Sequence, residues 1–192
     1  MSLVHRIFTP IPNEHGETTP DELVLHCTTC ERYSVAKQMA IYIDGACAGN
    51  GKPYARAGIG VSVCCVGDLN LSLPLLDGPQ TNQRAEIRAA IFALKIVCKL
   101  VKDREMRGRK GVVLISDSAY LVNAMTDWMS KWLKNRWRTS EGKPVTNMSD
   151  FMELEHLIQY LEGVHVPVQF WRVARSQNTQ ADRLAKEAIG LL

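Results

Sequence analysis

The spacing of apolar residues changes once along the chain, from the short runs and alternation of strands to the three-to-four spacing of helices. Apolar segments at 40–44, 56–66 and 69–75 are separated by turns that carry glycine, in "GNGKP" and "GD". Short runs bounded by such turns are typical of consecutive antiparallel strands. The first part of the pattern therefore predicts a three-stranded antiparallel meander.

A long helix is predicted next, beginning near Thr81. Its apolar positions recur at intervals of four, three, four and three residues, at Ile87, Ile91, Leu94, Cys98 and Val101. A buried strand is predicted at 111–118, helices at 119–129 and 151–161, and a last strand at 166–173. In the final helix, "NTQADRLAKEAIG", Thr179 and Asp182 have the spacing of a capping box. We therefore predict an α/β fold, a five-stranded mixed sheet of meander and parallel strands flanked by helices.

The composition is that of one globular domain with an extension. Of 192 residues, 46% are hydrophobic and 22% charged, and no apolar run approaches the length of a membrane span. Residues 1–38 lack sustained periodicity, although "ELVLHCTTC" is able to add a strand, and their first part contains no continuous apolar segment of the kind found in a signal peptide. We expect an intracellular protein, nuclear or cytoplasmic, with an N-terminal extension at 1–38 and a folded domain at 39–192.

The six cysteines lack the density and regular spacing of a disulfide framework. The spacing in "HCTTC", with His26, Cys27 and Cys30, is the one that resembles a zinc site. A structural zinc needs about four ligands, and no second pair follows. Ordinary strand or turn residues are the favoured interpretation.

Positive charge is concentrated in two segments although the net charge is only +3. Residues 95–110 hold seven basic and two acidic side chains, and residues 131–143 hold five basic and one acidic. The first segment is interpreted as a solvated helix end and is assigned no site. The second carries tryptophans among its cations, a composition that suits nucleic acid.

Four carboxylates occupy unusual positions. Asp44 lies inside an apolar strand, Asp117 at the end of another, and Glu86 and Asp182 lie early in helices. Strand ends and helix starts meet at the ligand sites of such sheets, and gathered carboxylates need a hard cation, Mg²⁺ or Mn²⁺. Helix capping would account for each acid except Asp44, because a mid-strand acid has no capping role.

Five segments resemble, in order and spacing, type-1 ribonuclease H, the cellular enzyme that cuts RNA in RNA–DNA hybrids. They are "YIDGACAGNG", "TNQRAEIRAAIFAL", "ISDSAYLVNAM", "WMSKWLKNRWRTSEGKPVTN" and "ADRLAKEA", within about 39–192. The resemblance implies the ribonuclease H-like fold, and hydrolysis of the RNA strand to 5′-phosphate and 3′-hydroxyl ends. It also implies that two Mg²⁺ ions, with Mn²⁺ as the alternative, are bound by Asp44, Glu86, Asp117 and Asp182. Asp44 would bridge both ions, Glu86 and Asp117 completing one site and Asp182 the other.

The resemblance also implies contacts with an RNA–DNA hybrid. Asn82 and Gln83 would meet the RNA strand, and Asn50 would read ribose 2′-hydroxyls. Thr81 and Asn147 would hold a DNA phosphate. The segment 128–138 resembles the family's basic handle along the DNA strand, with Tyr120, Trp128 and Trp132 as its wall and Lys131, Lys134, Arg136 and Arg138 attracting phosphates. Helical spacing alone would place the tryptophans in the core, and Trp137 is compatible with a structural role.

The sequence departs from the family pattern in two places. The loop at 173–182, "VARSQNTQAD", lacks the histidine that family members commonly carry there, with Arg175 as a partial substitute that would contact phosphate. We expect an active enzyme with altered turnover or pH dependence. We also expect it to be a monomer and to have no membrane partner. The family's small N-terminal hybrid-binding module is not recognisable in 1–38. The alternatives are a hybrid-binding module without turnover, and a nuclease domain of retroelement origin with the same chemistry.

Overall fold

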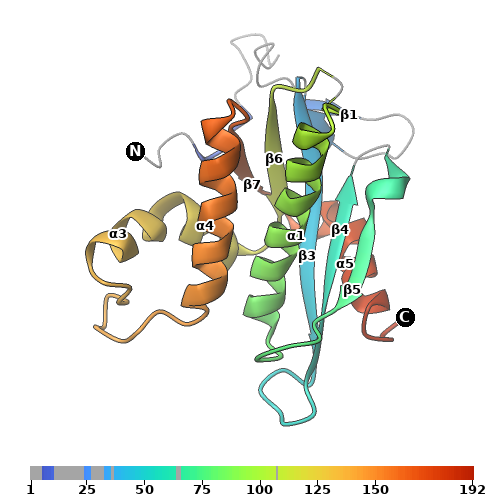
Figure 1. The fold of residues 1–192 in the computed structure, drawn as a ribbon. Helices are drawn as coiled ribbons and strands as arrows, with labels where there is room; N and C mark the ends of the chain where they lie inside the picture. Colours follow the sequence, from blue (N-terminus) through green and yellow to red (C-terminus); the bar gives the residue numbers. More distant parts are fainter. Residues whose placement is uncertain (1–5, 11–23, 27–32, 36, 64–65, 107) are drawn as a thin grey trace.

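A five-stranded mixed sheet, in the order β5-β4-β3-β6-β7, forms the centre of the computed structural model (Figure 1). The structure describes residues 6–10, 24–26, 33–35, 37–63, 66–106 and 108–192. The neighbouring pairs of β3, β4 and β5 are antiparallel, and those of β3, β6 and β7 are parallel. The predicted fold class is confirmed. The strands are β3 (Gln38–Ala48), β4 (Arg56–Val63), β5 (Leu71–Pro74), β6 (Gly111–Ser116) and β7 (Val168–Arg172).

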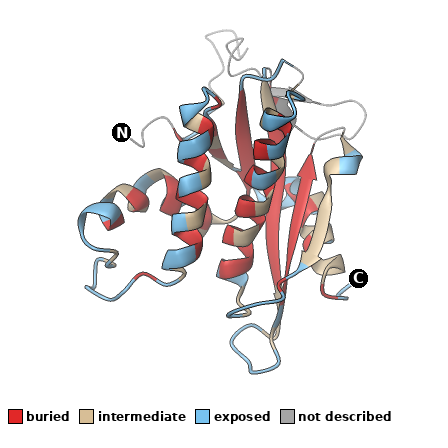
Figure 2. Cartoon of the chain, viewed as in Figure 1, coloured by how far each residue is buried: buried red, intermediate tan, exposed pale blue. Residues whose placement is uncertain are grey.

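Helices cover both faces of this sheet. In Figure 1, α1 (Asn82–Lys102) and α4 (Met148–Gly163) lie in front of the strands, and α5 (Thr179–Glu187) lies behind them. The apolar stripe predicted for α1 is buried against the sheet, and Figure 2 shows the central strands and the inner sides of α1 and α4 as buried. The core is therefore split by the sheet into two layers.

The segment after β6 differs from the single helix predicted at 119–129. It consists of α2 (Ala119–Asn123), a π-helical turn, η3 (Ala124–Trp128), and α3 (Met129–Lys134). Short 3-10 turns also occur at η2 (Gly67–Leu69) and η4 (Arg175–Gln177). Figure 1 shows α3 and the loop after it standing away from the sheet. Residues 119–147, which contain the basic segment 128–138 that was predicted as the handle, are together called the handle below.

The predicted capping box at the start of α5 is wrong. The N-cap residue is Asn178, whose side chain caps no backbone amide, and Thr179 is the first helical residue. The Asp182 carboxylate is instead bound by Arg175 at 3.0 Å and Lys186 at 2.6 Å. Two cationic partners outcompete a neutral backbone donor for a carboxylate because charge-assisted hydrogen bonds are the stronger kind.

Part of the predicted N-terminal extension packs on the sheet. Ile7 forms a parallel bridge with Phe170 of β7, and the Phe8 amide donates to the Phe170 carbonyl at 2.9 Å. The Phe8 ring is buried and lies 5.4 Å from the Trp171 ring. The predicted strand in "ELVLHCTTC" is found as β1 (Val24–His26), paired with β2 (Tyr33–Val35), while Cys27 and Cys30 lie outside the described residues.

A buried ion pair ties this segment to α4. Both terminal nitrogens of the Arg6 guanidinium donate to the Glu155 carboxylate, at 2.6 and 3.0 Å, and both residues are buried. Burial alone would raise the pKa of Glu155, but the hydrogen bonds and charge of Arg6 outweigh it and hold that pKa below its usual value. The pair is thus satisfied in both charge and geometry.

Glu155→Gln is expected to lower the free energy of unfolding at pH 7 by about 3 kcal/mol, because it leaves the Arg6 charge buried without its counter-charge. Folding lowers the pKa of this carboxylate. Such a group stabilises the native state above its unfolded pKa, about 4.3, and this contribution is lost as the pH falls through the folded pKa. The difference from wild type should therefore be full at pH 7 and shrink below about pH 4.3. Urea unfolding from pH 7 to pH 3 measures it. Glu162→Gln is the control, since Glu162 lies 3.4 Å from Arg6 and is partly exposed; a pH-independent difference for Glu155→Gln would contradict the assignment.

Among the described residues, no helix combines the length and apolar character that crossing a lipid bilayer requires.

Candidate active site

Gly45 brings Asp44 and Glu86 together. A Cβ atom at Gly45 would lie 2.4 Å from the Glu86 nitrogen and 2.6 Å from the Ala85 carbonyl carbon, so the first turn of α1 rests directly on β3 at this glycine. The Gly45 amide hydrogen-bonds to the carboxylates of both Asp44 and Glu86. The absence of a side chain at Gly45 is therefore what allows the two acids to share one amide.

Gly60 allows α5 to lie directly against the other face of the sheet. Gly60 is the partner of Asp44 in the β3–β4 ladder, and a Cβ atom there would lie 2.0 Å from the Ala181 carbonyl oxygen. The helix crosses β4 in direct backbone contact, and the residue after Ala181 is Asp182. The charge of Asp182 accordingly acts on Asp44.

Asn178 holds the fourth acid in place. Asp117 directly follows β6 and is half-buried, and its Oδ1 accepts from Asn178 Nδ2 at 2.7 Å. The same Nδ2 donates to the Ile43 carbonyl of β3 at 3.0 Å. Asn178 is 1% exposed, so this amide is a fixed bridge between β3, the end of β6 and the start of α5. Sequence reasoning missed it, because an amide ahead of a helix looks like an ordinary cap.

The site is short of positive charge at its centre. Asp44 and Glu86 are 4% and 5% exposed. Burial, and then the negative charge of Asp117, raises the pKa of Asp44 to about 7. Burial, then Asp44 and Asp117, raises the pKa of Glu86 well above its usual value, and Glu86 Oε2 is buried without a hydrogen-bond partner. Such groups are costly unless a cation neutralises them.

Asp182 differs, because the chain supplies its cations. Burial would raise the pKa of Asp182, but the bonds from Lys186 and Arg175 outweigh it and keep that pKa below its usual value. Arg175 lies in η4, in the loop that lacks the family's histidine, and its side chain is 73% exposed. The charge on Asp182 is thus already balanced on the protein side.

The carboxylate oxygens of Asp44, Glu86 and Asp117 suit a hard divalent ion, although they are not arranged as a complete metal-binding site. Within the described ranges, no three His, Cys, Asp or Glu side chains are arranged so that they could hold one metal ion. The charge of Asp117 nevertheless raises the pKa of both Asp44 and Glu86, so these carboxylates lie near one another, and all three offer oxygen ligands, which Mg²⁺ and Mn²⁺ prefer. The unpartnered Glu86 Oε2 fits the same group of ions.

The candidate RNA-contacting amides come from the β3–β4 turn and from the first turn of α1, which are in contact. The Asn82 backbone amide donates to Asn50 Oδ1 at 3.2 Å, which joins the β3–β4 turn to the start of α1. Asn50, Asn82 and Gln83 are exposed. Thr81 is the N-cap of α1, and its hydroxyl accepts from the Arg84 amide at 3.2 Å. The exposed amides leave polar groups free to face a nucleic acid.

The handle carries an aromatic cavity of about 520 Å³, with Gln83 of α1 on its edge. Trp128 and Trp132 are 5.8 Å apart, centroid to centroid, and Tyr120 is 6.0 Å from Trp128. Trp132 is only 7% exposed and packs on Phe151, so its helical spacing does reflect a core position, although it also lines the cavity. Trp137 stacks on Trp132, a structural role, and Lys134 is exposed.

A second cavity, of about 630 Å³, lies between the loop before α1 and the first turn of α4. Asn147, the N-cap residue of α4, lines it with Arg84 and Asp150. Asn147 has φ 60°, and its Nδ2 is buried without a hydrogen-bond partner. An unpartnered donor at the start of a long helix is suited to an anion.

The fold and the site define the chain as an α/β protein in which carboxylates from the central strand, from the end of β6 and from a helix on each face of the mixed sheet lie near one another. The model of the RNase H family matches residues 36–190. Ribonuclease H from Moorella thermoacetica is 35% identical over 81% of this chain and 94% of its own length. The chain belongs to the RNase H family, as its sequence motifs predict.

Two further comparisons agree. Ribonuclease H1 from Rattus norvegicus is 41% identical over 155 residues, 80% of this chain. The chain spans about half the length of this relative. The crystal structure of LC9-RNase H1, a type 1 RNase H with the type 2 active-site motif, superposes with a TM-score of 0.54 at 27% identity, covering 80% of this chain and 72% of that one.

Proposed function

We propose that the chain is a metal-dependent endonuclease that hydrolyses the RNA strand of RNA–DNA hybrids, leaving 5′-phosphate and 3′-hydroxyl ends. The observation that carries this proposal is the buried pair Asp44 and Glu86, joined at the Gly45 amide and lacking a counter-ion of their own. Family membership supplies the reaction that such a pair would serve. The catalytic domain is placed at 39–192.

Asp44, Glu86, Asp117 and Asp182 would hold two Mg²⁺ ions, with Mn²⁺ as the alternative. Such ions supply an activated water and neutralise charge on the leaving oxygen of a phosphodiester. The chain's own residues prepare the site. Asn178 fixes the direction of Asp117, and Arg175 and Lys186 keep Asp182 ionised and oriented. Arg175 is also exposed enough to contact a phosphate of the substrate.

Recognition of the RNA strand is assigned to Asn50, Asn82 and Gln83. A 2′-hydroxyl is both donor and acceptor, so an amide side chain beside a ribose distinguishes RNA from DNA. Asn50 already accepts from the Asn82 amide, which fixes the turn that presents it. Asn82 and Gln83 lie at the start of α1, a few residues before Glu86, and Asn50 lies in the β3–β4 turn beside them.

The DNA strand is assigned to the handle and to the second cavity. Tyr120, Trp128 and Trp132 would face the deoxyribose, and the handle cations would give a salt-dependent attraction. Those cations are Lys131, Lys134, Arg136 and Arg138. Thr81 and Asn147, the N-cap residues of α1 and α4, would hold one DNA phosphate, since helix N-termini favour anions.

The direct test compares three substrates. A uniformly labelled RNA strand is paired with DNA in the hybrid and with RNA in the RNA duplex, and a DNA duplex carries a labelled DNA strand. With Mg²⁺ we expect cleavage of the hybrid alone, and none after chelation. Binding of the hybrid without cleavage at any Mg²⁺ or Mn²⁺ concentration would instead identify a binding module. Cleavage of all three duplexes would contradict hybrid specificity.

A further inference from the structure

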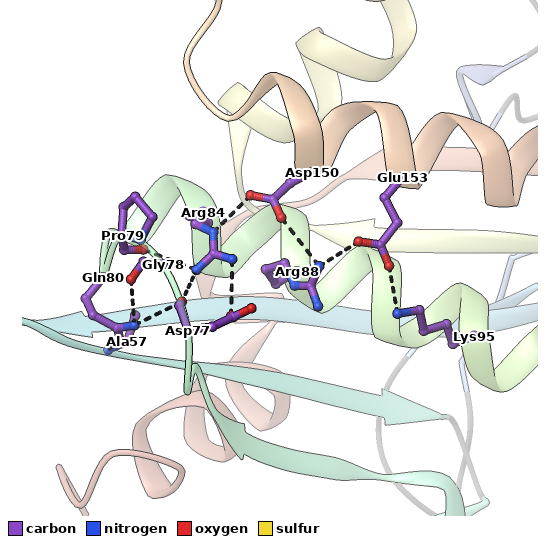
Figure 3. Close-up of polar contacts among 10 residues, drawn as sticks. All are labelled: Ala57, Asp77, Gly78, Pro79, Gln80, Arg84, Arg88, Lys95, Asp150 and Glu153. Carbon is purple, nitrogen blue, oxygen red and sulfur yellow. Dashed lines mark hydrogen bonds and ion pairs between the residues drawn. The ribbon is translucent and has the colours of Figure 1, made fainter.

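Arg84 gathers three segments around one guanidinium group (Figure 3). Its Nε donates to Asp150 Oδ2 of α4 at 2.9 Å, and its Nη2 lies 3.3 Å from Asp77 Oδ1. Its Nη1 donates to the carbonyls of Asp77 and Pro79. The side chains of Arg84 and Asp150 are 8% and 9% exposed, so this is an interior contact and not a surface ion pair.

The two partners occupy the same position in their helices. Arg84 follows Thr81, the N-cap of α1, by three residues, and Asp150 follows Asn147, the N-cap of α4, by three residues. The Arg84–Asp150 bond therefore joins the first turns of the two helices whose N-caps are assigned to the DNA phosphate. The loop that Arg84 holds, Asp77–Pro79, leads directly into Thr81.

The same helix pair carries a second ionic link that serves as a comparison. One turn further along α4, Glu153 accepts from Arg88 at 2.7 Å and from Lys95 at 2.7 Å. Figure 3 shows the contacts in succession along α1, with Arg84 nearest the loop and Lys95 farthest from it. Glu153 does not line the second cavity, whereas Arg84 and Asp150 do.

We propose that Arg84 and Asp150 are positioning residues for substrate binding, forming a clamp that fixes the Asp77–Pro79 loop, which leads toward Thr81, relative to Asn147 across the second cavity. The inference rests on the proposed function of that cavity. The guanidinium does not serve as the anion ligand, because its Nε and both terminal nitrogens already donate to the protein. A planar guanidinium is needed here, since a lysine ammonium lacks the fixed fork of donors that binds α4 and the Asp77–Pro79 loop in set directions.

The clamp is tested by measuring the Kd for a labelled hybrid by fluorescence anisotropy in the presence of a chelator. This measurement needs neither metal nor turnover. We expect Asp150→Asn to raise the Kd by about fivefold, the loss of roughly one hydrogen bond to phosphate. Arg84→Lys should act in the same direction. In cleavage assays the change should appear in KM, with kcat within about twofold, because the carboxylate site is untouched.

Glu153→Gln is the matched control. It also removes an acid of α4 that pairs with α1, so it reports what a loosened helix pair does by itself, and we expect its Kd to equal that of wild type. Thermal unfolding of each variant sets a temperature at which all are folded. A rise in Kd for Glu153→Gln equal to that for Asp150→Asn would overturn the proposal.

A double-mutant cycle makes the test independent of stability. If the clamp acts through Asn147, Asp150→Asn should raise the Kd much less in an Asn147→Ala background than in wild type. Independent, multiplying effects would show that Asp150 is merely structural. Failure of the clamp and failure of the proposed function give different results. If the wild-type chain binds a hybrid no more tightly than an RNA duplex, the proposed function is refuted. If Asp150→Asn leaves the Kd for the hybrid unchanged, the clamp alone is refuted.

Discussion

Asp44→Asn is expected to abolish hybrid cleavage, lowering kcat by at least about a thousandfold, the loss of several kcal/mol of metal-assisted stabilisation. The same substitution should make the protein more stable. Burial and the charge of Asp117 raise the pKa of Asp44 to about 7, so the folded state holds a proton that the unfolded chain releases near pH 3.9. Wild type then loses stability as pH rises between these values, and the asparagine variant does not.

Two measurements check this pair of effects. Cleavage of labelled hybrid with Mg²⁺ gives the loss of turnover, and urea unfolding with a chelator present should show the variant about 2 kcal/mol more stable at pH 8, with no difference at pH 4. Asp68→Asn, at an exposed position in η2, is the control and should change neither. Wild-type-like cleavage by Asp44→Asn would falsify the assignment of the active site.

Gly60→Ala is expected to lower the free energy of unfolding by about 3 kcal/mol, or the Tm by roughly 10 °C, and to impair cleavage as well. The added methyl would lie 2.0 Å from the Ala181 carbonyl oxygen and 2.6 Å from the Ala185 nitrogen, both in the backbone of α5, so the helix itself must move. Because Asp182 follows Ala181, cleavage should fall too, even at temperatures where the variant is folded.

Gly163→Ala is its matched control. This glycine ends α4, and a Cβ atom there would meet nothing within 4 Å. The control should leave cleavage unchanged and stabilise slightly, because alanine favours a helix more than glycine does. Thermal unfolding and hybrid hydrolysis at 20 °C below the lower Tm provide both readouts, and equal Tm values for the two variants would contradict the close approach of α5.

Periodicity was sufficient to predict the sheet and its long helix, but it misplaced the end of β3. The strand was predicted at 40–44, yet it continues to Ala48, and its residues Ile41–Ala48 pair with β4. Small residues are present there because helices press on the strand from both faces, as at Gly45. A local pattern carries no information about packing partners that lie far away in the chain.

The same limit applies to the site. The four acids were recognisable because each interrupts an apolar pattern or follows one. Asn178 and the Arg84–Asp150 clamp were not, because their partners are 61 and 66 residues away in sequence. Trp132 was hard to assign for a different reason, since it serves the core and the cavity wall together and a single spacing rule favours only one of these.

The bridge from Ile7 to Phe170 has a consequence for any shortened form of the protein. β7 is the last strand of the sheet, and unpaired backbone on an outer strand is a template for association with another chain. The match to the family model begins at residue 36. A fragment that began there would lack the backbone of Ile7 and Phe8, which covers the outer edge of β7, and the Phe8 ring, which packs on Trp171. Its solubility would then depend on what replaces them.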